Sequence, residues 1–507
     1  MRARVRQTRP DDSHGGETRD RFSTATRLAF LGGPMLSMID SSVVNVAVPV
    51  IVRELHTSLS TAAWTVSGYL LGLACGLAAT PWLARRFGTM RAYQAALLGF
   101  ILASAACAAA PSATLLIVAR VVQGLAGAPM VPLAMGLLLD NKTGARSMPA
   151  SAGLLLFAAP ALGPAIGGVL ISGFGWRSIF LINVPVGLAA WAGVRAGRKH
   201  GREDGDPGAR LDVPGLLLLA AGLGLATYGA SQGPDRGWLS PAAAPAWAGG
   251  LALIAGYLWW ARRRTRGSGT RPAVNLTLLA SRRRSVILAL ACVASVVLFA
   301  VLFLAPVFLQ GVQHHAATVT GLVLLPQGIV MGLASWLGNV VVERGRSRPA
   351  LIATSVAGGL AMLAVSTLGL LLLTASTPVW LTAALLCGRG LALGLTIQPL
   401  VMALPADLDA THMPDANTLF NIAERLSGSF GIALLATLYA TRTQVTGSPV
   451  TALHDCALAL TALCAAGALA ALSLRRPVRA GLPGRRRGPC PPAADRATMV
   501  SAANDAG

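Results

Sequence analysis

Charged side chains are scarce in this sequence. Asp, Glu, Lys and Arg make up 12% of its 507 residues, hydrophobic residues make up 54%, and the mean hydropathy is +0.61. A soluble domain carries about 25% charged residues, so the composition excludes an ordinary soluble protein of this length. Apolar runs of about 20 residues, the length that a helix needs to cross a bilayer, recur from Leu28 to Leu474. The sequence therefore predicts a polytopic, all-helical membrane protein.

Metal-binding and nucleotide-binding patterns are absent from the sequence. The seven cysteines form no CxxC pair, and neither a P-loop nor an HExxH motif occurs. GASQG at 229–233 matches GxSxG, but that nucleophile motif needs a strand before it and a helix after it, whereas this stretch lies at the end of an apolar helix. We therefore expect no enzyme activity, no metal, no cofactor and no transport driven by the protein's own ATP hydrolysis.

The positive charge is unevenly placed along the chain. We predict fourteen membrane spans, at residues 28–52, 61–83, 92–110, 113–139, 150–172, 178–194, 213–232, 244–261, 286–309, 319–341, 350–373, 378–402, 416–440 and 452–473. With the N-terminus in the cytoplasm, 35 of the 42 Lys and Arg residues lie in cytoplasmic segments, four lie in external loops and three lie within spans. This is the positive-inside asymmetry of membrane proteins. The net charge of +22 therefore indicates topology, with both termini cytoplasmic, rather than a nucleic-acid partner.

The spans fall into two similar halves. GAPMVPLAM at 127–135 and GLTIQPLVM at 394–402 close the fourth and twelfth spans and share Gly, Pro, Leu and Met at matching positions. A duplicated six-span unit explains this match, and repeated halves are typical of transporters whose binding site lies near the bilayer midplane. The predicted organisation is a cytoplasmic tail at 1–27, a six-helix bundle at 28–194, connectors with an extra helix pair at 195–285, a second six-helix bundle at 286–473 and a cytoplasmic tail at 474–507.

The fifth predicted span contains residues that normally break helices. Its segment ALGPAIGG, residues 161–168, includes Gly163, Pro164, Gly167 and Gly168. Inside a helix, proline costs about 3 kcal/mol and glycine about 1 kcal/mol relative to alanine. Small residues, however, let two helix backbones approach closely in a bilayer. The segment is therefore either a tight, bent seam between helices or an ordinary helix-packing contact.

Several segments of the chain together resemble a known transporter family. In chain order they are MIDSSVVNVAVPVI (38–51), WTVSGYLL (64–71), RVVQGLAGAPMVP (120–132, including Gln123 and Gly124), ALGPAIGG (161–168), WRSIFLINVPVG (176–187), LDVPGLLLL (211–219), FLQGVQHHAATVTGLVLLPQG (308–328) and NIAERLSGSFGIALLATL (421–438). Their order and spacing are similar to those of the major facilitator superfamily, in its fourteen-spanner branch of drug:proton antiporters. The resemblance implies a major facilitator fold of two six-helix bundles plus a central helix pair, and a bacterial plasma-membrane location.

The resemblance also implies an activity. Members of this branch export small, amphipathic or cationic drugs and antibiotics in exchange for protons, by alternating access. We therefore expect a small-molecule substrate, protons and the lipid bilayer as partners, and a monomer. Two alternatives stay open: a proton-coupled uptake symporter would share the fold, and a non-transporting membrane receptor would need no charged residues at mid-membrane.

Three charged residues within spans are candidates for proton coupling. Asp40 lies about 18 Å into the first span at 1.5 Å per residue, near mid-bilayer, where a charge is expensive and usually functional. It either binds and releases a proton or is a fixed acid that ties the first helix to its neighbour. Arg120 cannot lose its proton; the resemblance gives it a role in proton transfer, and the alternative is a structural ion pair. Glu424, in the thirteenth span, is a candidate coupling or cation-binding acid.

The loop after the second span departs from the family pattern. The family reads Gly-Arg-Leu-Ala-Asp-Arg-x-Gly followed by arginines, and its aspartate helps to latch the cytoplasmic face. This chain reads PWLARRFGTMR at 81–91, in which Arg85 replaces the aspartate. Pro81 replaces the first glycine, and of the other positions in this gate loop the chain keeps Leu83, Ala84, Arg86, Gly88 and a trailing Arg91. A latch through Arg85 would need an acid from the other half, for which Glu343 and Asp407 are the candidates.

Overall fold

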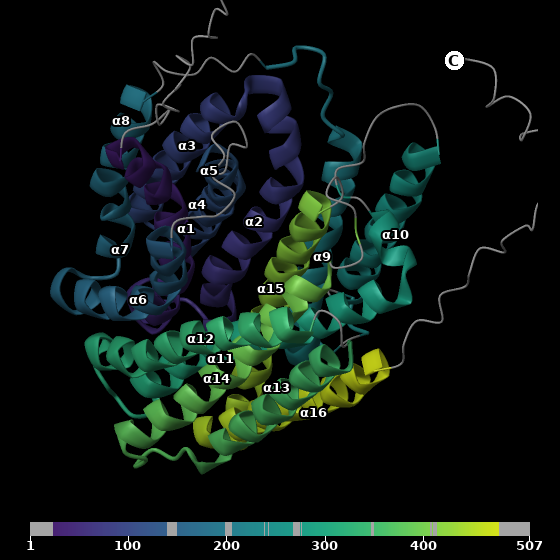
Figure 1. The fold of residues 1–507 in the computed structure, drawn as a ribbon. Coiled ribbons are helices and arrows are strands. Elements are labelled where there is room, and N and C mark those ends of the chain that lie inside the picture. The colour runs from purple at the N-terminus through teal and green to yellow at the C-terminus, as the bar shows by residue number, and fades with distance from the viewer. Residues whose placement is uncertain are drawn as a thin grey trace, which may run out of the picture. The chain divides into compact units, whose positions relative to one another are not determined.

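The regular structure in the described part of the chain consists of helices alone (Figure 1). The computed structural model describes residues 24–138, 150–197, 205–237, 239–241, 243–266, 274, 276–345, 349–405, 408 and 413–475. All of them belong to one compact unit. The predicted all-helical class is confirmed.

Each of the first six predicted spans is helical. The helices are α1 (Thr24–Glu54), α2 (Leu59–Phe87), α3 (Thr89–Ala109), α4 (Ala113–Gly127), α5 (Met130–Leu138), α6 (Ala150–Phe174), α7 (Ser178–Leu181) and α8 (Asn183–Gly197). The fourth and sixth predicted spans are interrupted, between α4 and α5 and between α7 and α8. Pro129 lies at the first interruption and Pro185 is the third residue of α8, just after the second; proline both lacks an amide hydrogen and collides with the carbonyl one turn earlier.

The remaining predicted spans are helical as well. The elements are α9 (Val213–Arg236), α10 (Ala243–Arg266), η3 (Leu276–Ala280), α11 (Arg282–Gly311), α12 (Ala317–Gly345), α13 (Pro349–Leu368), η4 (Gly369–Leu372), α14 (Val379–Ala403), α15 (Met413–Thr446), α16 (Pro449–Ala471) and η5 (Leu472–Arg475). The helices α9 and α10 lie at the residues predicted for the extra pair, and they pack against each other.

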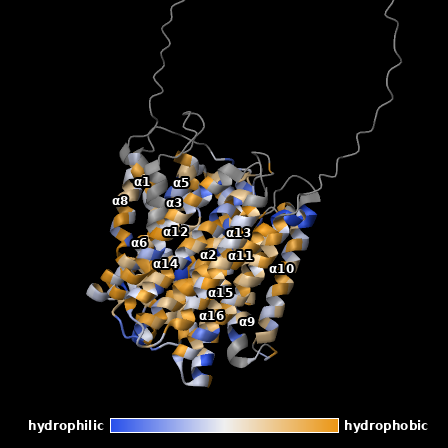
Figure 2. Cartoon of the chain, turned by 60° about the horizontal axis from the view of Figure 1, so that its bottom comes forward, coloured by the Kyte–Doolittle hydropathy of each residue, from blue (hydrophilic) through white to orange (hydrophobic). Residues whose placement is uncertain are grey.

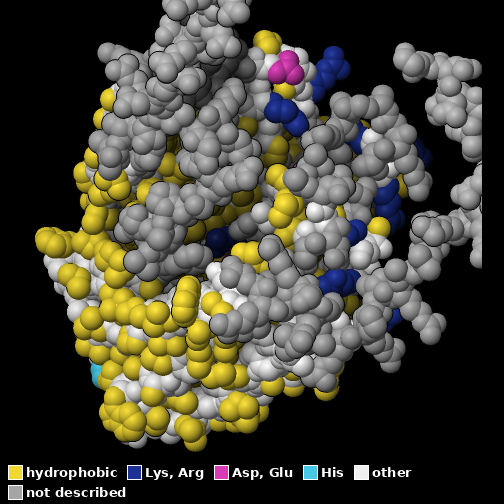
Figure 3. Space-filling model, in the orientation of Figure 1, with side chains coloured by type: hydrophobic (Ala, Val, Ile, Leu, Met, Phe, Trp, Pro, Cys, Tyr) yellow, Lys and Arg dark blue, Asp and Glu magenta, His cyan; other side chains and the backbone are white. Residues whose placement is uncertain are grey.

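By length and composition, eleven helices of the described part can cross a membrane. The helices α10 and α15 are not among these eleven, and α6 contributes the shorter apolar helix Pro160–Phe174. The helix α15 carries Glu424 and Arg425 within its length, and α10 ends in WWARRRTR. Hydrophobic residues run along the helices (Figure 2), whereas Lys and Arg gather toward α10 on the face shown in Figure 3. The chain is therefore a multi-pass membrane protein.

Several loops and helix ends meet at what we call the arginine-rich end of the bundle. The helix α1 begins there, because the Tyr93 hydroxyl near the start of α3 donates to the carbonyl of Phe30 (2.9 Å). The gate loop between α2 and α3 lies at the same end, with Arg85, Arg86 and Arg91. The helix α11 runs parallel to α1 and also begins there with three arginines.

Helices of the two halves meet along three seams, α1 with α11, α2 with α15, and α6 with α12. In the first seam the Gln310 side chain donates from Nε2 to the carbonyl of Val46 (2.9 Å). In the third, the Thr318 hydroxyl donates to the carbonyl of Gly168 (3.1 Å). Both contacts lie toward the end opposite the arginine-rich end, because Gln310 is one residue from the end of α11 and Thr318 is the second residue of α12.

The α2–α15 seam is held by two reciprocal hydrogen bonds. The Ser67 hydroxyl donates to the carbonyl of Ser429 (3.1 Å), and the Ser429 hydroxyl donates to the carbonyl of Ser67 (2.9 Å). Both residues are fully buried. The central helix α9 packs against both α2 and α15, so the extra pair lies beside this seam and contacts both halves.

The helix α6 continues through its glycines and prolines without a break. A Cβ atom at Gly163 would overlap the Ser42 hydroxyl of α1, and one at Gly167 would lie 2.6 Å from Val43 Cγ2 of α1. At Gly168 a Cβ atom would instead overlap the backbone carbonyl of Ala317, in α12 of the other half. The glycines of this segment therefore lie at close helix contacts, and they divide between two neighbours.

We expect Gly168→Ala to disfavour the closed α6–α12 contact, because the added methyl meets backbone atoms that cannot rotate away. Gly173→Ala is the matched control, since a Cβ atom there has no neighbour within 4 Å and alanine favours the helix by about 1 kcal/mol. Alkylation of a cysteine introduced at Thr318 would report the opening of the seam. Equal alkylation in the two variants would contradict the prediction.

Candidate functional site

A buried ion pair joins α1 to α4. Asp40 and Arg120 are 1% and 0% exposed, and Arg120 Nη1 lies 2.5 Å from Asp40 Oδ2. The sequence predicted each residue as a candidate separately, and the structure brings the two together. A buried charge is tolerated where a partner and further hydrogen bonds compensate its lost hydration.

The second oxygen of Asp40 is held by two side-chain amides. Its Oδ1 accepts hydrogen bonds from Gln123 Nε2 of α4 (3.1 Å) and from Asn183 Nδ2 of α8 (3.0 Å). The same two amide nitrogens also donate to the hydroxyl oxygen of Ser104 in α3, at 2.7 and 3.3 Å. The carboxylate therefore connects α1 to α3, α4 and α8, and all of these side chains are buried.

The guanidinium of Arg120 is held from the opposite side by α2. Its Nε donates to the carbonyl of Thr65 (2.9 Å), and its plane lies 3.9 Å from the centre of the Tyr69 ring. Nη1 also donates to Gln123 Oε1 (2.6 Å), and positions i and i+3 lie on one helix face. A Cβ atom at Gly124 would overlap the carbonyl of Tyr69, so glycine is what lets α2 approach α4 at this point.

Glu424 lies apart from this network. It is a half-buried residue of α15, in the other half of the chain, and the structure shows no ion pair or hydrogen bond between its carboxylate and any described residue. The adjacent Arg425 lies with its guanidinium 5.8 Å from the centre of the Phe299 ring. The three predicted coupling residues therefore form one buried pair and one separate acid.

Sequence reasoning missed Asn183 and Ser104. Asn183 lies within the WRSIFLINVPVG segment and Ser104 lies in α3, and each is a neutral polar residue inside an apolar span. That signal is weak, because Asn45 of α1 is equally buried yet donates only to the carbonyls of Ser41 and Ser42 in its own helix. A polar residue within a span is a better candidate for such a network when it is buried and has no hydrogen-bond acceptor in its own helix.

The gate loop contacts the connector through its backbone. The exposed Arg85 forms no ion pair with any residue that the structure describes, and its backbone carbonyl accepts a hydrogen bond from the amide of Asp206 (2.7 Å). Asp407 lies outside the described residues, as does the side chain of Glu343, so the predicted latch partners stay untested. Gly88 has a φ of +80° where α2 turns into α3, a backbone conformation that favours glycine.

A second contact fixes the connector to the end of α2. Trp82 Nε1 donates to the carbonyl of Ala209 (3.2 Å), and the Trp82 ring meets the ring of Phe87 edge-on. Asp212, at the end of the connector, accepts a hydrogen bond from Trp260 Nε1 (3.0 Å) in α10. The connector therefore joins the gate loop of the first half to the central helix pair.

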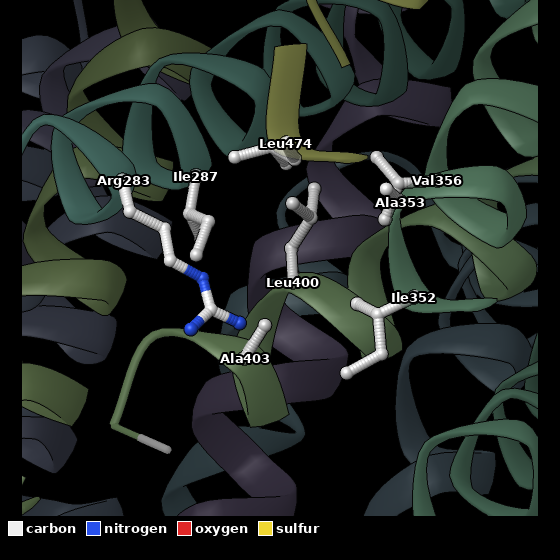
Figure 4. Close-up of a pocket in the computed structure, with 8 residues that line it drawn as sticks. All are labelled: Arg283, Ile287, Ile352, Ala353, Val356, Leu400, Ala403 and Leu474. Carbon is white, nitrogen blue, oxygen red and sulfur yellow. The ribbon is translucent and has the colours of Figure 1, made fainter. Parts of the chain in front are cut away.

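Two cavities lined by described residues are each too small for a drug-sized molecule. One lies at the arginine-rich end, with Arg283 beside an otherwise apolar lining (Figure 4), and the other lies among apolar residues of α11, α14 and α16. Each has a volume of about 10 Å³, which is about one water molecule. Neither cavity touches the Asp40 network.

Comparisons with known proteins agree with this architecture. The family model of the Major Facilitator Superfamily matches residues 30–432. The chain is 32% identical to a "Multidrug resistance protein B homolog" of Mycobacterium tuberculosis over 80% of this chain and 74% of that protein. It is 31% identical to the "Tetracenomycin C resistance and export protein" of Streptomyces glaucescens over 82% of this chain and 76% of that protein.

Solved structures share the fold at lower sequence identity. An auto-inhibited POT family peptide transporter has a TM-score of 0.62 at 18% identity, with 89% of this chain and 96% of that chain covered. A D-xylose–proton symporter has a TM-score of 0.57 at 14% identity, with 89% and 96% covered. At such identities the likeness concerns the fold alone.

We expect Trp82→Phe to loosen the connector, because phenylalanine keeps the ring contact but loses the hydrogen bond to Ala209, which is worth about 1 kcal/mol. Hydrogen exchange of the backbone amides in residues 205–212 would rise. Arg85→Ala is the control, since Arg85 uses its backbone carbonyl in the contact with Asp206. A rise in Arg85→Ala as large as in Trp82→Phe would contradict the assignment.

Proposed function

The chain belongs to the Major Facilitator Superfamily, and we propose on this basis that it exports a small drug or antibiotic in exchange for protons. Curated relatives at about 30% identity, named for multidrug resistance or for antibiotic resistance and export, support the substrate class. We propose fourteen spans, arranged as six, two and six with the boundaries given above. The protein would be a monomer in a bacterial plasma membrane, with both termini in the cytoplasm.

The buried pair of Asp40 and Arg120 is the observation that carries proton coupling. It is a titratable acid near mid-membrane, beside a group that stays charged. When a proton binds Asp40 Oδ2, the carboxyl becomes neutral and its attraction to Arg120 is lost. Arg120 would keep its bonds to the carbonyl of Thr65 and to Gln123 Oε1, so the change falls on the contact between α1 and α4.

The three seams between the halves support alternating access. Hydrogen bonds cross them between Gln310 and Val46 and between Thr318 and Gly168, toward the end opposite the arginine-rich end. With the arginine-rich end in the cytoplasm, this state is closed to the outside. At 100 mV, one proton moving inward releases about 2.3 kcal/mol, enough for a roughly fifty-fold substrate gradient.

We propose that Glu424 contributes to recognition of cationic substrates. Its carboxylate is half-buried and has no basic partner among the described residues. A carboxylate in a low-dielectric surrounding attracts a cation more strongly than it would in water. Its separation from the Asp40 network divides the roles, with proton binding in the first half and substrate binding in the second.

Asp40→Asn should abolish proton-driven export while the protein stays folded and inserted. Substrate counterflow in proteoliposomes should persist, because counterflow needs the conformational change but no net proton movement. Asp455→Asn is the control, since Asp455 pairs with Arg442 away from the network. Export by Asp40→Asn with the parent's pH profile would remove Asp40 from the mechanism. If the parent protein showed no counterflow, a receptor would be favoured. If it accumulated substrate from outside, driven by protons, uptake would be favoured.

Glu424→Gln should weaken export of a cationic substrate by roughly tenfold and leave a neutral substrate of similar size within about twofold. The reason is the loss of one charge of attraction, about 1.4 kcal/mol for a tenfold effect. Apparent affinities of both substrates, measured in the same vesicles, make the comparison. Equal loss for both substrates would show that Glu424 supports the fold or the transport cycle instead.

A further inference from the structure

Asp40 and three other side chains close a ring of hydrogen bonds. Asp40 Oδ1 accepts from Gln123 Nε2 and Asn183 Nδ2, and the Ser104 hydroxyl oxygen accepts from the same two nitrogens. Each amide thus uses one hydrogen toward Asp40 and the other toward Ser104. The ring is buried, since none of the four side chains is more than 2% exposed.

We propose that Asn183 and Ser104 position the Asp40 carboxylate so that its proton binds at Oδ2, the oxygen that Arg120 holds. This inference rests on the proposed proton coupling. Neither residue exchanges the proton itself, so both are positioning residues. Asn183 contributes a hydrogen-bond donor, and Ser104 contributes the acceptor that orients the two donors.

The donor directions in the ring follow from electrostatics. A flipped amide at Gln123 or Asn183 would turn its carbonyl oxygen toward the carboxylate, and two acceptors would then face each other. With both amides donating, the two lone pairs of Asp40 Oδ1 are filled. A proton at Oδ1 would face two N–H donors and leave one of them unpaired in a buried place, which is costly.

The proton therefore binds at Oδ2, where it replaces the contact with Arg120 Nη1. One bond forms, between the proton and Oδ2, and one ion pair breaks. Proton binding and release of Arg120 become a single event. If the ring were open, Oδ1 could take a proton while Arg120 stayed in place, and proton binding would no longer change the contact between α1 and α4.

Asn183→Ala is the first test of this ring. Donors to a carboxylate stabilise its ionised form, and Asn183→Ala removes one of the two donors at Oδ1. The pH at half-maximal proton-driven export should rise by about one to two units, the equivalent of a lost hydrogen bond to a charged group. The number of protons taken up per substrate exported should also rise, because some protons would bind without releasing Arg120.

Ser104 offers a conservative pair of variants. Ser104→Ala removes the shared acceptor and should shift the pH midpoint in the same direction, by less than Asn183→Ala. Ser104→Thr keeps the hydroxyl and should restore the parent midpoint. Asn45→Ala is the matched control, because Asn45 is a buried asparagine of α1 that donates only within its own helix. Its midpoint should stay at the parent value.

The outcomes separate this inference from the proposed function. Thermal unfolding in detergent first shows that each variant is folded, and the Ser104 pair carries the test if Asn183→Ala is not. An unchanged pH midpoint and proton ratio in the folded variants, with Asp40→Asn still inactive in proton-driven export, would overturn the positioning role alone. Proton-driven export by Asp40→Asn with the parent's pH profile would overturn the proposed function.

Discussion

The constraint on which this structure depends is the need to compensate charge inside a membrane protein. Asp40 and Arg120 are both buried, and removing two such ions from water costs several kcal/mol each before their attraction is counted. Attraction repays this cost only when the remaining hydrogen-bonding groups are also satisfied. The amides of Gln123 and Asn183 and the carbonyl of Thr65 satisfy most of these groups, whereas Arg120 Nη2 has no hydrogen-bond partner among the described residues. The positions of α1, α2, α3, α4 and α8 relative to one another are therefore tied to one ion pair.

Close backbone approach is the second device that shapes the bundle. Gly124 brings α2 onto α4 beneath Arg120, and Gly163 and Gly167 bring α6 onto α1. In a bilayer, the lipid tails are as apolar as the helix surfaces, so helices gain mainly from close packing and from hydrogen bonds. Gly168 uses the same device across the two halves, where it meets Ala317 of α12. Some of these glycines thus lie at contacts within one half and Gly168 lies at a contact between the halves. Their sequence pattern alone does not distinguish the two kinds of contact.

The helices could be predicted from the sequence because length and hydropathy decide membrane helices almost alone. The interruptions at Pro129 and Pro185 depend on local proline geometry, which the apolar pattern masks. The sequence also indicated Asp40 and Arg120, since a charge within a span stands out. It could not show that they pair, because eighty residues separate them, nor that Glu424 lies apart. Asn183 was missed because a neutral amide within a span can hydrogen-bond to a carbonyl of its own helix as readily as to a distant carboxylate.

The proton site and the seams between the halves share short stretches of the same two helices. Thr65, which holds Arg120, is two residues from Ser67, which bonds to α15. Asp40 is six residues from Val46, whose carbonyl bonds to α11. A proton on Oδ2 would leave Arg120 attached to α2 and Asp40 attached to Gln123 of α4 and Asn183 of α8, so the contact that is lost is the ion pair between Asp40 and Arg120. A small displacement there acts at once on the α1–α11 and α2–α15 seams. The α6–α12 seam is built on glycine packing and the hydrogen bond of Thr318, and its described side chains include no titratable group, so it would follow the movement and not start it.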